Sequence, residues 1–154
     1  MPEKCTIYCL QRAWNTIQKL SKKSFERVTI RDKTKGSESL EAHGKKNSLI
    51  RLSHLSFIRR ADEFTQLRGS TWVYLGSLET EDVKAKDRVM SHVENSESIV
   101  GVVVKPRFDK DDRFDQLVSS IAAECNGLVF NGDEWMDPNG KVVLSLGEDG
   151  PPLP

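Results

Sequence analysis

The chain of 154 residues is 37% hydrophobic and 30% charged, with 23 basic and 23 acidic side chains and a mean hydropathy of −0.50. This length and composition are those of one folded domain with its own core, which excludes an intrinsically disordered protein. The most apolar run, residues 99–104, is far too short to cross a bilayer, and the N-terminus has no apolar segment typical of a signal peptide. The sequence therefore predicts a single domain, residues 1–154, that works in the cytoplasm and contacts no membrane.

The zero net charge hides an uneven distribution along the chain. Residues 1–60 carry 14 Lys/Arg and 5 Asp/Glu, a net charge of +9, whereas residues 61–154 carry 9 and 18, a net charge of −9. Such an asymmetry indicates oriented binding to charged partners, unless the two halves interleave in the fold and neutralise each other. The cysteines Cys5, Cys9 and Cys125 are odd in number and lack CxxC spacing, which predicts no disulfide framework.

The N-terminal third predicts two short strands around a helix. Residues 5–10 and 25–30 have the β-branched and aromatic content of strands, and residues 13–20 have apolar side chains at helical spacing. Residues 31–47 are dominated by Lys, Gly, Ser and Glu, which predicts a mobile surface loop. Residues 48–57 then alternate as a strand would, with Ile50, Leu52 and His54 on one side.

Two helices are expected in the middle of the chain. Asp62 is a suitable N-cap for the first, which Gly69 weakens near its centre. Thr80 is the expected N-cap of the second, with acidic residues in its first turn and apolar residues on one face.

The C-terminal third carries the clearest pattern. Residues 98–104 are a continuous β-branched run, as a buried interior strand requires. A helix that ends at Cys125 follows, then a strand at 128–130, a turn at 137–140 and a strand at 141–146. This unit would be of the strand-helix-strand type, extended by a hairpin, and residues 147–154 would form an irregular tail.

The expected fold class is therefore α/β or α+β, with a single mixed β-sheet flanked by helices. No linker or internal repeat divides the chain. The unit at 98–130 would be a right-handed crossover if its two strands are parallel.

The motifs of common chemistries are missing from the sequence. The acidic run that begins at Asp109 has Phe114 and Ser120 where a calcium-binding loop needs glycine and glutamate. His43, His54 and His92 are widely spaced and form no metal-binding motif, and no phosphate-binding glycine loop or nucleophile elbow occurs. We expect no catalytic residue, metal or cofactor, although residues distant in sequence could still bring a His–Cys or His–Asp pair together.

Two charged segments are candidate interfaces. The first is basic, with interleaved Trp14 and Phe25, and could hold a nucleic-acid backbone; its key residues would be Lys19, Lys22, Lys23 and Arg27. The second is acidic and has the composition of a protein interface around a tryptophan. Its predicted partner-binding residues are Asp133, Glu134, Trp135 and Asp137, with a second acidic group of Asp109, Asp111, Asp112 and Asp115.

Several C-terminal segments together resemble small uncharacterised bacterial proteins. Some of those proteins occur with polymorphic or contact-dependent toxin systems and look like immunity proteins. The similarity covers roughly residues 48–146 and contains no catalytic motif, so it transfers no functional residues. The segments that carry it are Ser98-Ile99-Val100-Gly101-Val102-Val103, Phe108-Asp109, Arg113-Phe114, Asn126-Gly127-Leu128-Val129-Phe130 and Asp137-Pro138-Asn139-Gly140.

The resemblance implies a binding protein without catalytic activity, an immunity protein that blocks the active site of a cognate toxin. An acidic patch suits this role, because nuclease toxins present basic substrate clefts. The alternatives are a nucleic-acid-associated protein that uses the basic N-terminal half and a cryptic hydrolase.

Overall fold

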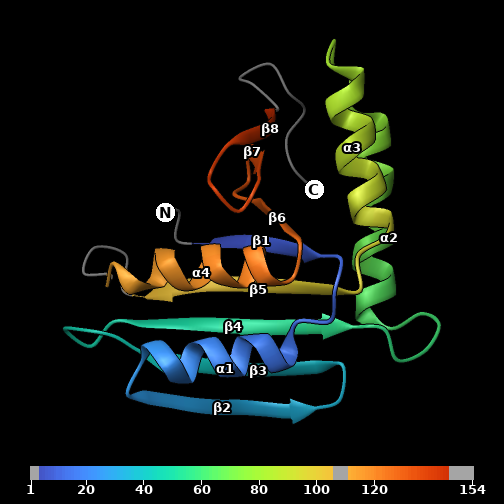
Figure 1. Ribbon diagram of the computed structural model, residues 1–154. Helices are drawn as coiled ribbons and strands as arrows, with labels where there is room; N and C mark the ends of the chain where they lie inside the picture. The colour runs from blue at the N-terminus through green and yellow to red at the C-terminus, as the bar shows by residue number, and fades with distance from the viewer. Residues whose placement is uncertain (1–3, 106–110, 146–154) are drawn as a thin grey trace.

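The computed structural model describes residues 4–105 and 111–145, and its strands form one eight-stranded sheet (Figure 1). The strand order is β2-β3-β4-β5-β1-β6-β7-β8, and all the neighbouring strands that it describes are antiparallel. One sheet flanked by helices confirms the expected α+β class, but the expected mixture of parallel and antiparallel pairs is not found among the described strands, since each of their pairs is antiparallel. The strands are β1 (Lys4–Cys9), β2 (Arg27–Thr34), β3 (Ser37–His43), β4 (Leu49–Ser56), β5 (Ser98–Lys105), β6 (Gly127–Phe130), β7 (Glu134–Met136) and β8 (Val142–Ser145). The helices are α1 (Trp14–Ser24), α2 (Glu63–Ser77), α3 (Val83–Glu94) and α4 (Arg113–Glu124).

The N-terminal strand β1 lies in the middle of the sheet. It pairs antiparallel with β5 on one side and with β6 on the other, so β5 and β6 run parallel to each other with β1 between them. The predicted strand-helix-strand unit is therefore confirmed, with one strand inserted into it. The expected interior position of β5 is also confirmed, since Val100, Val102 and Val104 are buried.

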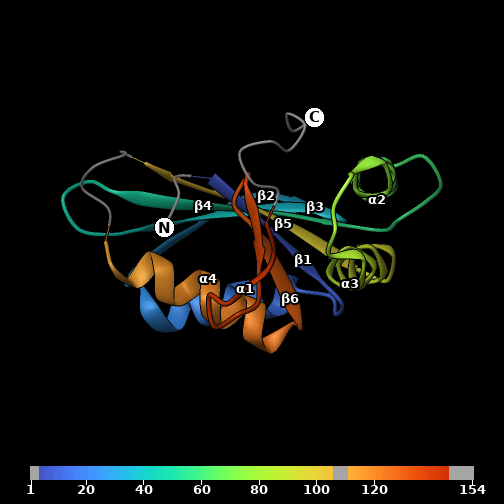
Figure 2. The ribbon, with the colours of Figure 1, turned by 90° about the horizontal axis from the view of Figure 1, so that it is seen from above.

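Helices α1 and α4 cover one face of the sheet and contact each other there (Figure 2). The predicted buried face of α4 is confirmed, because its large apolar residues, which recur every third or fourth position, are all buried. Helix α4 packs tightly on the sheet at Gly127, where an added Cβ would lie 2.7 Å from Ile7 and 3.2 Å from the Ala122 backbone. The buried residues of α4 are Phe114, Leu117, Val118, Ile121 and Ala122.

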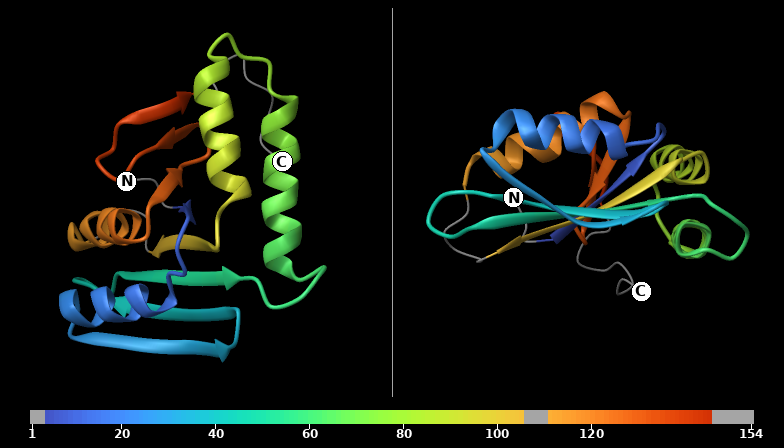
Figure 3. Two further views of the ribbon diagram at one scale, coloured as in Figure 1. Left: turned by 45° about the vertical axis from the view of Figure 1, so that its right-hand side comes forward. Right: turned by 90° about the horizontal axis from the view of Figure 1, so that it is seen from below.

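A second core lies where α2 and α3 stand side by side at one end of the sheet (Figure 3). Asp62 is the N-cap of α2, as expected, and accepts a hydrogen bond from the Thr65 N–H. Helix α3 begins later than predicted: Asp82 caps it and Thr80 only accepts a bond from the Asp82 N–H. The buried members of this core include Tyr8, Phe64, Leu75, Val89, Val93 and Trp135.

The prediction of a mobile loop at 31–47 is wrong. Most of this segment belongs to β2 and β3, which are joined by a tight turn at Gly36, where φ is +81°. Strand β3 is interior, so both of its neighbours satisfy its backbone hydrogen bonds despite its polar composition. Its alternate residues Leu40 and Ala42 are fully buried, and Glu41 on the other face forms ion pairs with arginines of β2 and β4.

The sheet order keeps the two charged halves of the chain apart. Strands β2, β3 and β4 make up one side of the sheet, and β6, β7 and β8 the other. Of the N-terminal elements in the described residues, only β1 crosses to the acidic side. The later strands of the two halves therefore lie on different sides of the sheet, although helices α1 and α4 of the two halves contact each other.

The predicted irregular tail at 147–154 and the residue Asp109 lie outside the described residues. Within residues 4–105 and 111–145, no helix is both long and apolar enough to cross a membrane.

Replacing Ile121 on the buried face of α4 tests this packing. Ile121→Asp should unfold the protein, because it removes about 1.5–3 kcal/mol of apolar burial and leaves a carboxylate without water. The lost burial and the desolvated carboxylate together remove a large part of the total stability of a small domain, which is about 5–15 kcal/mol. Gln116→Asp, at an exposed position of the same helix, should change stability by less than about 0.5 kcal/mol. Equal loss in both variants, measured by thermal melting, would show that the helix face is misassigned.

Candidate functional site

The acidic residues expected to bind a partner come together only in part. Asp115 of α4 and Asp137 of the β7–β8 turn, one from each predicted group, line the same groove of about 190 Å³. Asp112 and Asp133 are exposed and Glu134 is half-buried, and all three lie outside the lining of this groove. The groove therefore collects two carboxylates that are far apart in the sequence.

The floor of this groove is apolar. Its apolar lining residues are Cys5, Val118, Val129, Met136 and Pro138. Burial and, to a smaller extent, the nearby Asp115 carboxylate raise the pKa of the Cys5 thiol to about 12. The thiol is therefore uncharged at neutral pH and is not a nucleophile. We call this region, with Asp115 and Asp137 at its rim, the acidic groove.

The turn between β7 and β8 fixes the position of Asp137. Its Oδ1 accepts hydrogen bonds from the Asn139 N–H at 2.9 Å and the Lys141 N–H at 3.0 Å. This is an Asx turn, in which a short side chain takes the place of a backbone acceptor. Asp115 is exposed in the first turn of α4, where a carboxylate interacts favourably with the helix dipole.

Two of the predicted partner-binding residues are buried. Trp135 exposes 1% of its surface and packs between the rings of Tyr8 and Phe130, in the core under α3. Sequence alternation places Trp135 and Met136 on opposite faces of β7, and Met136 rather than Trp135 faces the groove. Trp135 therefore stabilises the sheet and does not lie on a partner-facing surface.

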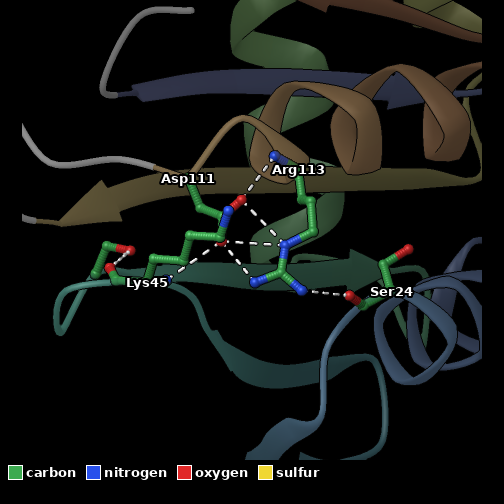
Figure 4. A network of polar contacts seen from close by, with 5 residues as sticks. Ser24, Lys45, Asp111 and Arg113 are labelled. Atoms are coloured by element: carbon green, nitrogen blue, oxygen red, sulfur yellow. Dashed lines mark hydrogen bonds and ion pairs between the residues drawn. The ribbon is translucent and has the colours of Figure 1, made fainter.

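Asp111 is the second buried residue of the predicted set, and it pairs with Arg113 (Figure 4). The guanidinium donates from Nη2 at 2.6 Å and from Nε, and the Lys45 N–H donates to the same carboxylate at 3.2 Å. These bonds, with the Arg113 contribution largest, hold the pKa of Asp111 well below its usual range. Asp111 therefore connects α4 to the β3–β4 turn.

This pairing predicts acid sensitivity. Because the pKa of Asp111 is lowered on folding, its stabilising effect is complete above its ordinary pKa of 3.8 and is lost as the pH falls below that value. Asp111→Asn should cost about 1.5–3 kcal/mol at pH 7 and progressively less as the pH is lowered from 4 toward 2, as measured by urea unfolding. The exposed neighbour variant Asp112→Asn is the matched control and should change stability little at pH 7. A cost of Asp111→Asn that does not depend on pH would contradict the ion pair.

A buried polar network joins three strands and α1. The Nδ1 atom of His54 lies 2.9 Å from Glu38 Oε1, and its Nε2 lies 2.8 Å from Ser98 Oγ. Ser98 Oγ also accepts the Ala13 N–H at 3.0 Å. Because the Glu38 carboxylate only accepts, Nδ1 carries the proton of the neutral imidazole and the Ser98 hydroxyl donates to Nε2. His54 is therefore the neutral tautomer that carries its proton on Nδ1 and donates it to Glu38.

This order of serine, imidazole and carboxylate is that of a hydrolase triad, but the group is closed to substrate. Ser98 and His54 expose 0% and 1% of their surfaces, and Trp14 stacks on the imidazole. No carbonyl can reach Ser98 Oγ in this conformation. The network instead fixes the start of α1 against β4 and β5.

Sequence reasoning missed this network because Glu38 lay in the segment predicted to be a loop. The sequence predicted an alternating strand with His54 on one side, but it did not predict Glu38 as the partner of His54. Two cysteines that are distant in sequence also come together in the fold, Cys9 and Cys125, and both are buried. The Cys9 thiol hydrogen-bonds to Cys125 and lowers the pKa of Cys125 to about 7.

The neutral His54 predicts a second pH effect. Burial lowers the pKa of His54 below its ordinary 6.5, although Glu38 opposes this. Below pH 6.5 the unfolded chain therefore gains a proton that the folded chain resists, and stability falls by at most about 1.4 kcal/mol per pH unit. His54→Gln should reduce this slope between pH 7.5 and 5.5 in urea unfolding. Glu38→Gln keeps the buried imidazole and should keep the slope; a slope unchanged by His54→Gln would overturn the assignment.

No group of three or more His, Cys, Asp or Glu side chains that could hold a metal ion occurs among the residues that the structure describes. A scan against protein-family models, a search of curated proteins and a search of solved structures each returned no match. The assignment of function therefore depends on the geometry of the chain itself.

Proposed function

We propose that the chain is a cytoplasmic binding protein without catalytic activity, an immunity protein that neutralises a bacterial toxin by blocking the toxin's active site. The observation that carries this proposal is the acidic groove. There, Asp115 and Asp137, from two acidic segments, lie at the rim of an apolar floor.

The size and chemistry of the acidic groove suit a basic side chain of a protein partner. Its volume of about 190 Å³ is below the 300–1,000 Å³ usual for small-molecule sites. Lysine and arginine bury an apolar stem while the charged head stays near water or a carboxylate. Val118 and Met136 are suited to contact such a stem, and Asp115 and Asp137 to accept hydrogen bonds from its head.

The position of the groove also favours long-range electrostatic attraction of a basic partner. It lies on the acidic side of the sheet, between α4 and the β7–β8 turn, away from the basic strands β2–β4. A field of this polarity accelerates encounter with a basic substrate cleft, such as that of a nuclease toxin, and orients the two proteins. The basic half of the chain then faces away from the toxin.

The test is the double variant Asp115→Asn and Asp137→Asn. Asparagine keeps the oxygen that accepts the turn N–H groups of Asp137, so the fold should be retained. The cognate toxin would be sought as the protein encoded beside this chain and tested by co-expression for growth and by calorimetry for affinity. The double variant should bind about tenfold to hundredfold more weakly and lose protection.

Asp87→Asn is the matched control, since it removes an exposed carboxylate on α3 outside the groove. It should retain affinity and protection. Wild-type affinity in the double variant would show that the groove is not the docking surface. Absence of any complex with the neighbouring protein would contradict the immunity function itself.

A further inference from the structure

A larger cleft lies beside the basic strands β2 and β3 and reaches the start of α4, the helix that also contributes Asp115 to the acidic groove. It has a volume of about 620 Å³ and is bordered by the link from α1 to β2, the β3–β4 turn and the start of α4. Its lining is polar and includes Glu26, Arg27, His43, Lys45, Asn47 and Arg113. The acidic groove shares none of these residues. We call it the basic cleft.

Positive charge dominates this lining. Arg27, Lys45 and Arg113 come from three separate segments, and Glu26 is the one carboxylate among the described lining residues, which leaves a formal excess of +2. The excess is still +1 when the buried Asp111 behind Arg113 is included. Neither Arg27 nor Lys45 forms an ion pair with a carboxylate of the described chain.

Arg113 is held in place before any ligand arrives. Its Nε and Nη2 donate to Asp111, and its Nη1 donates to the Ser24 carbonyl oxygen at 2.9 Å. The guanidinium also lies 4.6 Å from the ring centroid of Phe25. Of its five N–H groups, one on each Nη atom is left for a ligand. A fixed fork of this kind loses little entropy on binding an oxyanion.

The turn that carries Lys45 is equally constrained. The Lys45 N–H donates to Asp111 Oδ2, and the Lys45 carbonyl accepts the Ser48 hydroxyl. Gly44 has no room for a side chain, because a Cβ there would lie 2.8 Å from Phe114 and 2.9 Å from Asp111. One buried carboxylate therefore sets the positions of both Arg113 and the backbone of Lys45.

We propose that the basic cleft binds phosphate groups, either of a free nucleotide-like polyphosphate or of a nucleic-acid backbone. Arginine supplies a planar fork and lysine a mobile point charge, a combination suited to phosphate oxygens. The cleft volume of about 620 Å³ lies within the 300–1,000 Å³ usual for small-molecule sites. The role is additional to toxin binding and uses different residues.

Two probes distinguish the sources of phosphate: inorganic pyrophosphate and a short single-stranded oligothymidylate, each titrated by calorimetry at low salt. The test variant is Arg27→Gln with Lys45→Gln, both at exposed positions. The control is Lys33→Gln, which lies near the other end of β2, opposite Glu38. The double variant should weaken binding at least about tenfold, and the control less than about twofold.

Each outcome decides the proposal. Binding of both probes with the expected loss supports a site for phosphate in general, and binding of the oligonucleotide alone assigns the nucleic-acid backbone as the source. In either case affinity should fall steeply with added salt. Absence of binding by both probes, or equal losses in the double variant and in Lys33→Gln, would overturn the proposal. Neither result bears on Asp115 and Asp137.

Discussion

The pairing of β1 with both β5 and β6 is the constraint on which the rest of the structure depends. Without it the sheet would separate into a four-stranded half and a three-stranded half, since no other described strand pair joins them. The backbone bonds continue past the strand, because the Leu10 and Gln11 N–H groups donate to the carbonyls at the end of α4. The residue Ile7 is completely buried at this junction.

The same topology gives the molecule its electrical polarity. The strands that follow α1 pair with one another on one side of β5, and those that follow α4 pair on the other side of β1. The strands of the basic segment and those of the acidic segment therefore stay apart in the sheet. A neutral protein of this kind can present a cationic and an anionic surface at once, which its net charge and pI would not indicate.

Much of the fold was predictable because hydrophobic periodicity reports burial directly. The β-branched run of β5 and the helical spacing in α4 each identified an element and its inward face. Strand β3 was not predictable, because its stability comes from its neighbours: Glu38 and Glu41 find partners on β2 and β4 that are far from obvious in sequence. For the candidate site, the sequence predicted only which kinds of residue would take part. The sequence indicated an acidic patch, but burial of Trp135 and Asp111 and the meeting of Asp115 with Asp137 follow from tertiary packing.

The central place of β1 also has a consequence for the order of assembly during translation. The ribosome makes β1 before the other strands of this sheet, yet its neighbours begin only at Ser98 and Gly127. Its apolar side chains therefore lack sheet partners until those segments have been synthesised. The β2–β4 meander, by contrast, pairs through short turns and can form early. Strand β1 therefore gains both of its neighbours only after Phe130 has emerged, and until then it is an unpaired apolar strand that is prone to aggregation.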